Sequence, residues 1–511
     1  MPSIVIEKPL GGWGKDLSGS NSGPVEARKN QYSKSTAISL FRRGKLGHIA
    51  PGETFSALAD ASTRVNGLPL NGVVSSTGEV FVYIDTARVI NFGAVDETID
   101  NHRQVALAVG HAAHTTLSGA NCDVLAYRNA TDEYILYSWN DNTDGDVGRM
   151  LKDATSPDDD WLSTLATQRN GSVLTLGVPH IMRIGPDGFI YITNGAYLAQ
   201  HDPASTIVDY QVFLPFGIGW IITDIEIDGN YLVVSGYKNT VAATPNFGEA
   251  RVAYWDTFSP DPNLVLDLDD FYVSAIKRDA SGRLIAWTRG KNNTSKIKVP
   301  GERKKFRTMF ETAQAGILPR AGSKDLVEDM LLFANNGAER LMALDGDDFH
   351  YRTAVTTDGA TSPIDLGMVK ELVSGTLYIG RNSSGSLYDI VKMSTTTYHI
   401  NADFRTRLLE FPSRSNIKSI EVYLSQFGSG ASLLFSLFRD YTAISIGGAT
   451  DLLNETRTNT VLGSVSYFKI VRAINDVNSC YLNIRFNHAS ASNTAAIIRK
   501  VVINYEPTDK I

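Results

Sequence analysis

Short apolar runs separated by polar, glycine-containing turns recur along most of the chain. The clearest example begins with the mostly apolar residues 181–184, followed by a turn at residues 185–188. Residues 189–193 then alternate aromatic and β-branched side chains, and Asn194-Gly195 turns the chain again before the apolar start at Tyr197. Pro-Asp-Gly and Asn-Gly supply the backbone angles of tight reversals, so this stretch predicts a three-stranded antiparallel meander.

Six other stretches repeat this order of apolar strand, polar or glycine turn, and strand rich in Tyr, Ile, Leu and Val. They are residues 73–90, 124–138, 222–235, 273–287, 330–344 and 369–389. A single meander cannot bury both of its faces, and repeats spaced by about 40 to 50 residues are typical of propeller blades. The seven units predict an all-β fold with a β-propeller of about seven blades.

The apolar pattern divides the chain into three parts. Residues 1–60 are polar and rich in glycine, which predicts an extended N-terminal arm that docks on a partner or remains a mobile tail. Residues 61–397 carry the repeats. Residues 398–511 contain longer runs with period-two alternation, which predicts a C-terminal antiparallel β-sandwich. A helical turn is considered only at residues 36–43 and 306–315.

Composition supports a large, turn-rich β protein. The chain has 511 residues, of which 43% are hydrophobic, and it contains 43 glycines. It has two cysteines, Cys122 and Cys480. They fall in different predicted domains, so two buried thiols in a reducing compartment are favoured over a disulfide.

Net charge and hydropathy limit the partners and the cellular compartment that the sequence favours. The formal net charge is −7 and no basic stripe is interleaved with aromatic residues, which disfavours direct nucleic-acid binding. The first residues lack the features of a signal peptide, and no apolar run reaches the length of a membrane span. We therefore expect the protein to be made in a cytoplasm and kept there until assembly.

The sequence contains only weak candidates for catalytic and metal-binding motifs. His111 and His114 form an H-x-x-H pair without a third ligand, and residues 140–145 resemble half of a calcium loop without its terminal acidic residue. The acidic turn at residues 345–348 is weaker still. We expect no metal and no cofactor.

One strand carries acidic residues that could face a propeller channel. Asp224, Glu226 and Asp228 alternate along it. Propeller hydrolases place paired carboxylates on the inner strands around the channel. The repeat at residues 278–287 shares a glycine and a tryptophan with sialidase-like blades but lacks their threonine. We therefore assign no catalytic residue and expect that the protein is not an enzyme.

Two insertions and one basic cluster are candidate contact regions. The insertions are residues 139–161 and 237–252, and insertions of this kind fall on one rim of a propeller. The basic cluster is Lys296, Lys298, Arg303, Lys304, Lys305 and Arg307. A solvated loop is the favoured interpretation, and contact with an acidic partner is the alternative.

Three segments resemble one protein family. The opening IEKPLGGWGKDLS, the blade LVSGTLYIGRNSSGSLYDIVK, and INADFRTRLLEFPSRSNIKSIEVYL with the terminal RKVVINYEP are similar to parts of β-propeller structural proteins of bacteriophage tails. Within that family the chain resembles nozzle or hub subunits, which lie below the portal and adaptor of short-tailed phages. The longer polar lead of this chain differs from them and leaves the upstream neighbour open.

This resemblance implies a structural virion subunit. It would form a homo-oligomeric ring, often sixfold, and contact other tail proteins such as adaptor or fibre subunits. DNA would pass through the channel without specific binding. The alternatives are a tail-tip or receptor-binding module that recognises host surface glycans through residues 139–161 and, third, a propeller glycan hydrolase.

Overall fold

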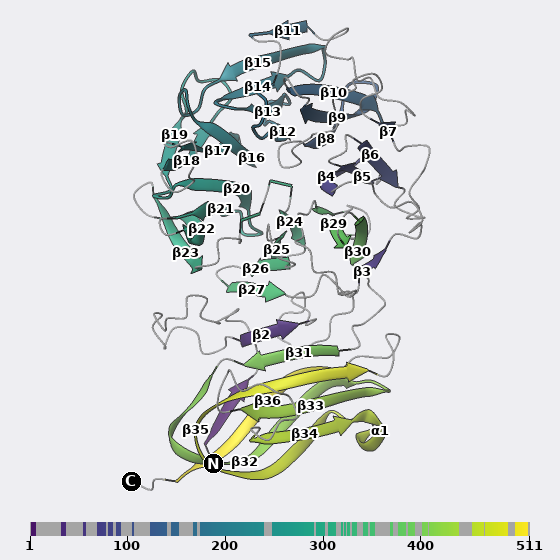
Figure 1. Cartoon of the computed structure of the whole chain (residues 1–511), viewed down its shortest axis with the longest axis vertical. Helices are drawn as coiled ribbons and strands as arrows, with labels where there is room; N and C mark the ends of the chain where they lie inside the picture. Colours follow the sequence, from purple (N-terminus) through teal and green to yellow (C-terminus); the bar gives the residue numbers. More distant parts are fainter. Residues whose placement is uncertain are drawn as a thin grey trace. The chain divides into compact units, whose positions relative to one another are not determined.

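A computed structural model describes 36 strands and one helix (Figure 1). The described residues are 2–6, 32–36, 55–57, 69–77, 80–84, 88–92, 105–106, 123–140, 145–152, 167–170, 174–239, 248–290, 293–301, 305–312, 318–319, 321–322, 324–327, 330–334, 341–345, 348–352, 368–370, 377–384, 387–393, 401–406, 408–438, 452–463, 465–488 and 496–508. Within these ranges no helix is long and apolar enough to cross a membrane.

The chain divides into two compact units. The first contains residues 1–55, 340–357 and 393–511, and the second contains residues 56–339 and 358–392. Strand pairing gives seven small sheets and one sheet of eight strands among the described residues.

The seven small sheets are the predicted blades. The first consists of β4 (Pro69–Val74), β5 (Val80–Ile84), β6 (Arg88–Phe92) and β7 (Val105–Ala106), and the second of β8 (Val124–Arg128), β9 (Glu133–Asn140) and β10 (Gly145–Leu151). The third consists of β11 (Thr167–Arg169), β12 (Met182–Ile184), β13 (Ile190–Asn194), β14 (Tyr197–His201) and β15 (Ile207–Phe213).

The remaining blades follow the same plan. The fourth is β16 (Ile221–Asp228), β17 (Tyr231–Asn239), β18 (Gly248–Trp255) and β19 (Leu264–Asp267), and the fifth is β20 (Tyr272–Arg278), β21 (Leu284–Arg289), β22 (Ser295–Pro300) and β23 (Phe306–Thr312). The sixth is β24 (Lys324–Val327), β25 (Met330–Ala334), β26 (Leu341–Asp345) and β27 (Asp348–Arg352). The seventh is β28 (Met368–Lys370), β29 (Leu377–Ser384), β30 (Leu387–Met393) and β3 (Phe55–Ala57).

The meander predicted from residue 181 onward is confirmed. β12, β13 and β14 pair antiparallel in sequence order. Gly188 and Gly195 take φ values of 86° and 63° in the two turns, where a side chain would be strained. Both turns therefore depend on glycine, as the sequence indicates.

The first strands of the blades surround a common centre (Figure 1). β4, β8, β12, β16 and β20 contact one another in succession, while β24 contacts β28 and β28 contacts β4. The last blade takes its outer strand, β3, from the N-terminal part of the chain. This pairing joins the two ends of the repeat array, so the described sheets form the propeller that the sequence predicts.

Apolar side chains fill the space between neighbouring blades. Tyr191 and Phe213 of the third blade pack with Ile225 and Trp255 of the fourth, and the Phe213 and Trp255 rings stack with centroids 3.9 Å apart. Burial of each such side chain contributes about 1.5–3 kcal/mol. Contact between blades is therefore what makes each small sheet stable.

The sheet of eight strands forms the C-terminal β-sandwich. Its strands are β1 (Ser3–Ile6), β2 (Tyr32–Thr36), β31 (Asn401–Thr406), β32 (Leu409–Phe427), β33 (Ala431–Phe438), β34 (Leu453–Thr458), β35 (Tyr467–His488) and β36 (Ala496–Pro507). Helix α1 (Asn459–Leu462) follows β34. In one layer the order is β1-β36-β32-β35, and in the other it is β34-β33-β35-β31-β2.

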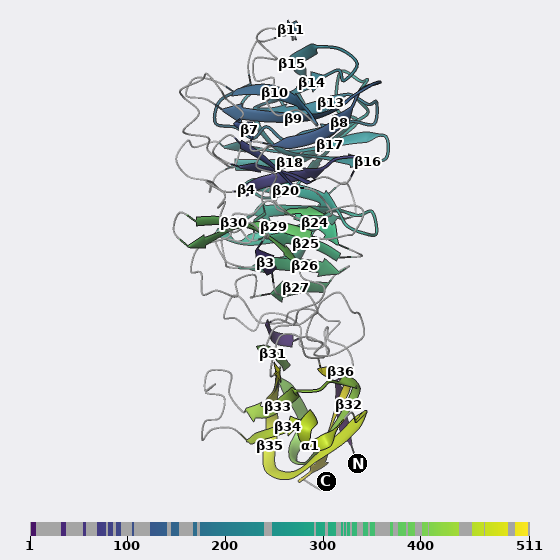
Figure 2. The ribbon, with the colours of Figure 1, turned by 90° about the vertical axis from the view of Figure 1, so that its right-hand side faces the viewer.

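Strand β35 belongs to both layers. Its first residues pair with β32, whereas its last residues pair with β33 and β31. Asp476, at φ 61°, lies at the bend, where an irregular register lets a strand change direction. Phe435 and Phe468 then meet between the layers with ring centroids 5.8 Å apart, and Figure 2 shows β33 and β34 facing β32 and β36.

Several local expectations are wrong. Residues 306–312 form β23, paired with β22, instead of a helical turn. The repeat unit at residues 330–344 contains the second and third strands of its blade, because the first strand is the short β24. Insertion 237–252 is shorter than expected, since β17 extends to Asn239 and β18 begins at Gly248.

The structure also places part of the N-terminal arm. β1 pairs with β36 and β2 pairs with β31, so these segments of residues 1–60 lie in sheets of their own chain. In the other helical candidate, residues 36–43, Thr36 is the last residue of β2, and residues 37–43 lie outside the described residues.

Candidate functional site

A network of buried charges joins the first strands of several blades. Arg183 on β12 lies between two carboxylates, with Nη1 3.3 Å from Asp123 Oδ2 and Nη2 3.8 Å from Asp224 Oδ1. Lys324, at the start of β24, donates to Asp224 Oδ2 at 2.6 Å. We call these four residues the central ion network.

The two carboxylates of the network make the same backbone contacts. Asp123 accepts hydrogen bonds from the amides of Val124 and of Met182 on the next blade, at 2.9 and 2.8 Å. Asp224 accepts from the amides of Ile225 and of Ile276 on the next blade, both at 2.9 Å. Each aspartate therefore fastens its own blade to the following one.

This arrangement reflects a longer repeat in the sequence. The intervals from Asp123 to Asp224 and from Asp224 to Asp325 are both 101 residues, which is two blades. Asp325 Oδ1 accepts from the next amide, Leu326, at 2.8 Å, as the other two aspartates do. Alternate blades thus begin with the same capped aspartate.

Burial perturbs the charged groups of the network. It raises the pKa of Asp123, an effect that Arg183 and two backbone amides oppose. Burial likewise lowers the pKa of Lys324, and the adjacent Asp224 carboxylate opposes this shift. Each charge is stabilised chiefly by its partner, so the network holds blades together.

The three carboxylates that the sequence placed near a channel all face cations. Asp224 binds Lys324, Glu226 Oε2 lies 3.4 Å from Lys277 Nζ, and Asp228 Oδ1 lies 3.2 Å from Arg278 Nη1. Each of the three carboxylates therefore holds a cation of its own chain. Nothing in this geometry favours the hydrolase alternative.

A second buried cluster lies within the fifth blade. The Nζ atoms of Lys296 and Lys298 are 3.1 and 2.8 Å from the Asp270 carboxylate, which also accepts a hydrogen bond from Thr288 Oγ1 at 2.7 Å. The expectation of a solvated basic loop is therefore wrong for these two lysines, which lie on β22. Lys305 pairs with Asp269 at the surface, and residues 302–304 lie outside the described residues.

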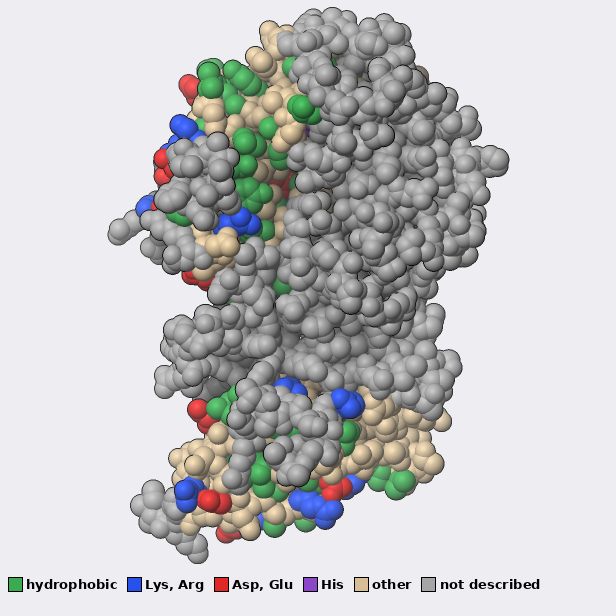
Figure 3. All heavy atoms as spheres, viewed as in Figure 1, with side chains coloured by type: hydrophobic (Ala, Val, Ile, Leu, Met, Phe, Trp, Pro, Cys, Tyr) green, Lys and Arg blue, Asp and Glu red, His purple; other side chains and the backbone are tan. Residues whose placement is uncertain are grey.

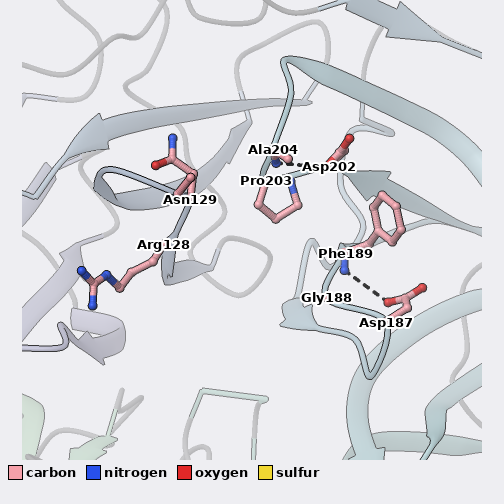
Figure 4. Close-up of a pocket in the computed structure, with 9 residues that line it drawn as sticks. Arg128, Asn129, Asp187, Gly188, Phe189, Asp202, Pro203 and Ala204 are labelled. Atoms are coloured by element: carbon pink, nitrogen blue, oxygen red, sulfur yellow. Dashed lines mark hydrogen bonds between the residues drawn. The ribbon is translucent and has the colours of Figure 1, made fainter.

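A shallow pocket opens where turns of the second and third blades meet (Figure 4). Its volume is about 280 Å³. The lining residues are Arg128, Asn129, Ala130, Asp187, Gly188, Phe189, Asp202, Pro203 and Ala204. We call it the rim pocket.

Neighbouring contacts hold the acidic side of the rim pocket in place. Asp187 accepts hydrogen bonds from the Phe189 amide at 3.2 Å and the Tyr191 hydroxyl at 2.7 Å. Asp202 accepts from the Ala204 amide at 2.9 Å. Burial and the Asp187 carboxylate both raise the Tyr191 pKa, which keeps its hydroxyl a donor.

A rigid turn between β18 and β19 presents an exposed aromatic ring. Phe258 is 84% exposed. Asp256 accepts hydrogen bonds from the Phe258 and Ser259 amides at 3.0 and 2.8 Å and from Asn263 Nδ2 at 2.9 Å. Thr257 has φ 68°, an unfavourable value for a β-branched residue. We call residues 256–263 the Phe258 turn.

Most of the other sequence candidates give little support for a chemical site. His111, His114 and Cys122 lie outside the described residues, whereas Cys480 is a buried free thiol. Asn140 pairs with Gly145 across the β9–β10 hairpin, and residues 141–144 between them are not described. In the described ranges no three His, Cys, Asp or Glu side chains are grouped as a metal site would require.

Sequence reasoning missed the central ion network. Arg183 and Lys324 were not singled out, because each occupies a short strand beside glycine or proline. The available signal was the aspartate followed by an apolar residue at the start of alternate blades. That signal marks Asp123, Asp224 and Asp325.

Comparison with known proteins assigns no family and no activity to this chain. No family model and no curated protein matches the chain. Similar solved structures include the PQQ-bound aldose sugar dehydrogenase from Streptomyces coelicolor, with 13% identity, TM-score 0.37, and coverage of 68% of this chain and 99% of that one. Another is the exo-β-1,3-galactanase from Phanerochaete chrysosporium with galactose, with 8% identity, TM-score 0.29, and coverage of 66% and 99%.

A third similar structure is the extracellular domain of a one-component system protein from B. thetaiotaomicron. It has 9% identity and a TM-score of 0.42, and the match covers 89% of this chain and 59% of that one. At these identities the likeness concerns the fold, and no activity or ligand is transferred from any of the three.

Proposed function

We propose that this protein is a non-enzymatic structural subunit of a bacteriophage tail, similar to nozzle or hub subunits. It assembles in the host cytoplasm into a homo-oligomeric ring around the DNA channel, and other tail proteins such as adaptor or fibre subunits bind to it. The proposal rests on the family resemblance of the sequence together with the physical properties of the described surface.

The observation that carries the proposal is the Phe258 turn. Exposed apolar residues are common singly, but a large ring held outward on a backbone with an unfavourable φ value has a cost in the isolated chain. Contact with another subunit would offset that cost by burying the ring. Figure 3 shows other hydrophobic side chains on the described surface among Lys, Arg, Asp and Glu.

The charge pattern supports a mechanical role. The central ion network and Asp270 place buried charges in ion pairs that fasten strands together. A chain with net charge −7 attracts DNA weakly, so DNA can slide through a ring of such subunits.

Two measurements test this proposal. Light scattering and negative-stain imaging of the purified full chain should give a closed ring, and mass spectrometry should find the protein in purified virions. A chain that stays monomeric at micromolar concentration and is absent from virions would overturn the proposal.

A second candidate function is a receptor-binding module for host glycans, and the rim pocket favours it. Phe189 offers an apolar face while Asp187 and Asp202 offer oxygen acceptors, a combination that suits a sugar ring. Pockets that bind drug-sized molecules have volumes of about 300 Å³ or more, so the volume of the rim pocket suits a single small sugar ring. A glycan array on the full chain tests it, and absence of any bound saccharide would exclude it.

A further inference from the structure

The layer β1-β36-β32-β35 of the terminal sandwich has an outer face with an ordered set of side chains. Strand register places them in three rows. The rows are Tyr467, Tyr423 and Lys500; Lys469, Glu421, Val502 and Val5; and Val471, Ser419, Asn504 and Ser3. The alternate residues, such as Phe468 and Ile470, are buried in the sandwich.

This outer face exposes apolar side chains. Val471, Val5 and Tyr467 are 67%, 43% and 42% exposed. The ring of Tyr467 lies against Tyr423, with centroids 4.9 Å apart. Tyr467 and Val471 lie on either side of Lys469 on β35, so one protein partner could bury both side chains together.

The polar groups of the outer face are already paired. Glu421 accepts hydrogen bonds from Tyr423 Oη at 3.1 Å and Asn504 Nδ2 at 3.0 Å, and its carboxylate lies 3.1 Å from Lys469 Nζ. Covering Glu421 leaves its carboxylate hydrogen-bonded, which lowers the cost of burying it against protein. The same pairing leaves few groups to hydrogen bond a sugar, so a protein partner is favoured.

Charge indicates which protein surface fits. Lys469 and Lys500 outnumber Glu421, so the outer face is positive on a chain whose net charge is −7. The Phe258 turn has the complementary character, because it carries Asp256 and Asp261 and no lysine or arginine between residues 256 and 263. Hydrogen bonds to the Asp256 carboxylate from Ser259 and its neighbours hold its pKa well below the usual range, so it is ionised.

We infer that the Phe258 turn of one copy docks on the outer face of the terminal sandwich of the next copy. This inference rests on the proposed ring and assigns its contact. The two surfaces are different, so the contact is heterologous, which is the type that builds rings. Phe258 would pack on Tyr467 and Val471, while Asp261 would approach the lysines.

Single variants with matched controls test the contact. Phe258→Ser and Val471→Asp should each weaken self-association about tenfold or more, measured by light scattering over a concentration series. The controls are Ile218→Ser, in the same unit as Phe258, and Val461→Asp, in the same unit as Val471; their wild-type side chains are 79% and 81% exposed. Both controls should associate as the wild type does.

Mixing the two variants separates this inference from the ring proposal. Phe258→Ser retains the outer face and Val471→Asp retains the turn, so an equimolar mixture should stop at dimers of twice 55.7 kDa. A wild-type ring with unaffected variants, or a mixture that stays monomeric or rebuilds the ring, would overturn the inference and leave the ring proposal standing. A monomeric wild type would overturn both.

Discussion

Replacement of Lys324 by methionine removes one charge from the central ion network and keeps most of the side-chain volume. The Lys324 side chain is 1% exposed, and its ammonium group donates to Asp224 Oδ2 at 2.6 Å and to the Ala321 carbonyl at 2.7 Å. Without it, Asp224 remains a buried carboxylate beside Arg183, whose Nη2 lies 3.8 Å from Asp224 Oδ1. We therefore expect Lys324→Met to destabilise the propeller.

The magnitude follows from the geometry. At an effective dielectric constant of about 20, unit charges at the Lys324–Asp224 distance attract by about 6 kcal/mol, and those at the Arg183–Asp224 distance by about 4 kcal/mol. Part of the first term is offset because lysine no longer has to be desolvated. Removal of one partner of a buried pair costs about 3–5 kcal/mol. Because Arg183 remains, we expect the lower end, about 3 kcal/mol.

Guanidinium unfolding followed by tryptophan fluorescence measures this loss. Trp220, Trp255 and Trp287 are buried in the same unit as Lys324, so the signal reports on the propeller. The matched control is Lys305→Met, which removes a 64% exposed lysine paired with Asp269 at 3.8 Å. Exposed pairs contribute about 0–1 kcal/mol.

Equal midpoints for the two variants would refute the reasoning, because the network would then contribute no more than a surface pair. A double variant adding Asp224→Asn supplies a further check. The double variant should lose less unfolding free energy than the sum of the two single losses. The reason is that Lys324→Met alone leaves the Asp224 charge buried without its lysine, and Asp224→Asn removes that charge.

Three other perturbations have defined outcomes. Burial lowers the pKa of His180 to about 4 from 6.5, so the unfolded state binds a proton first and stability falls as pH drops from 6.5 toward 4. His180→Gln should spare about 2 kcal/mol of the loss in unfolding free energy measured at about pH 5. Gly248→Ala would place a Cβ 2.5 Å from the Lys238 carbonyl oxygen, and a lowered guanidinium midpoint corresponding to about 1–3 kcal/mol is expected; an unchanged midpoint would contradict this packing. Burial raises the pKa of Cys480 to about 12, so in a Cys122→Ser variant iodoacetamide should label the folded chain slowly and the unfolded chain rapidly, and fast labelling of both would place the thiol at the surface.

Much of the propeller could be predicted because its blades carry local signals. Gly188 and Gly195 mark turns whose backbone requires glycine, and residues 189–193 between them alternate aromatic and β-branched side chains. Such signals lie within a few residues of each other. The number of sheets and their antiparallel order follow from them.

Other features depend on distant residues and left no local pattern. β3 is three residues long within a polar segment, so nothing near it indicates a pairing with β30. β35 runs from Tyr467 to His488 through a bend at Asp476, and no local pattern indicates that one strand would pair in both layers.

The buried ion pairs of β22 also could not be predicted from the local sequence. Lys296 and Lys298 alternate with Ile297 and Val299, a strand-like pattern with lysines on one face that is normally exposed. Their partner Asp270 belongs to a preceding turn, and only the fold brings them together. A charge pattern in the sequence therefore could not separate a solvated face from a buried ion pair.

The pairing of β3 with β30 also sets the order in which the molecule can be completed. During synthesis β3 leaves the ribosome early. Its partner β30 (residues 387–393) follows only after the first six blades have been made. Until then the array has two unpaired strand edges that could join those of another nascent chain. Final closure is therefore a late, long-range event, and once it has formed it removes the edges through which chains could exchange blades.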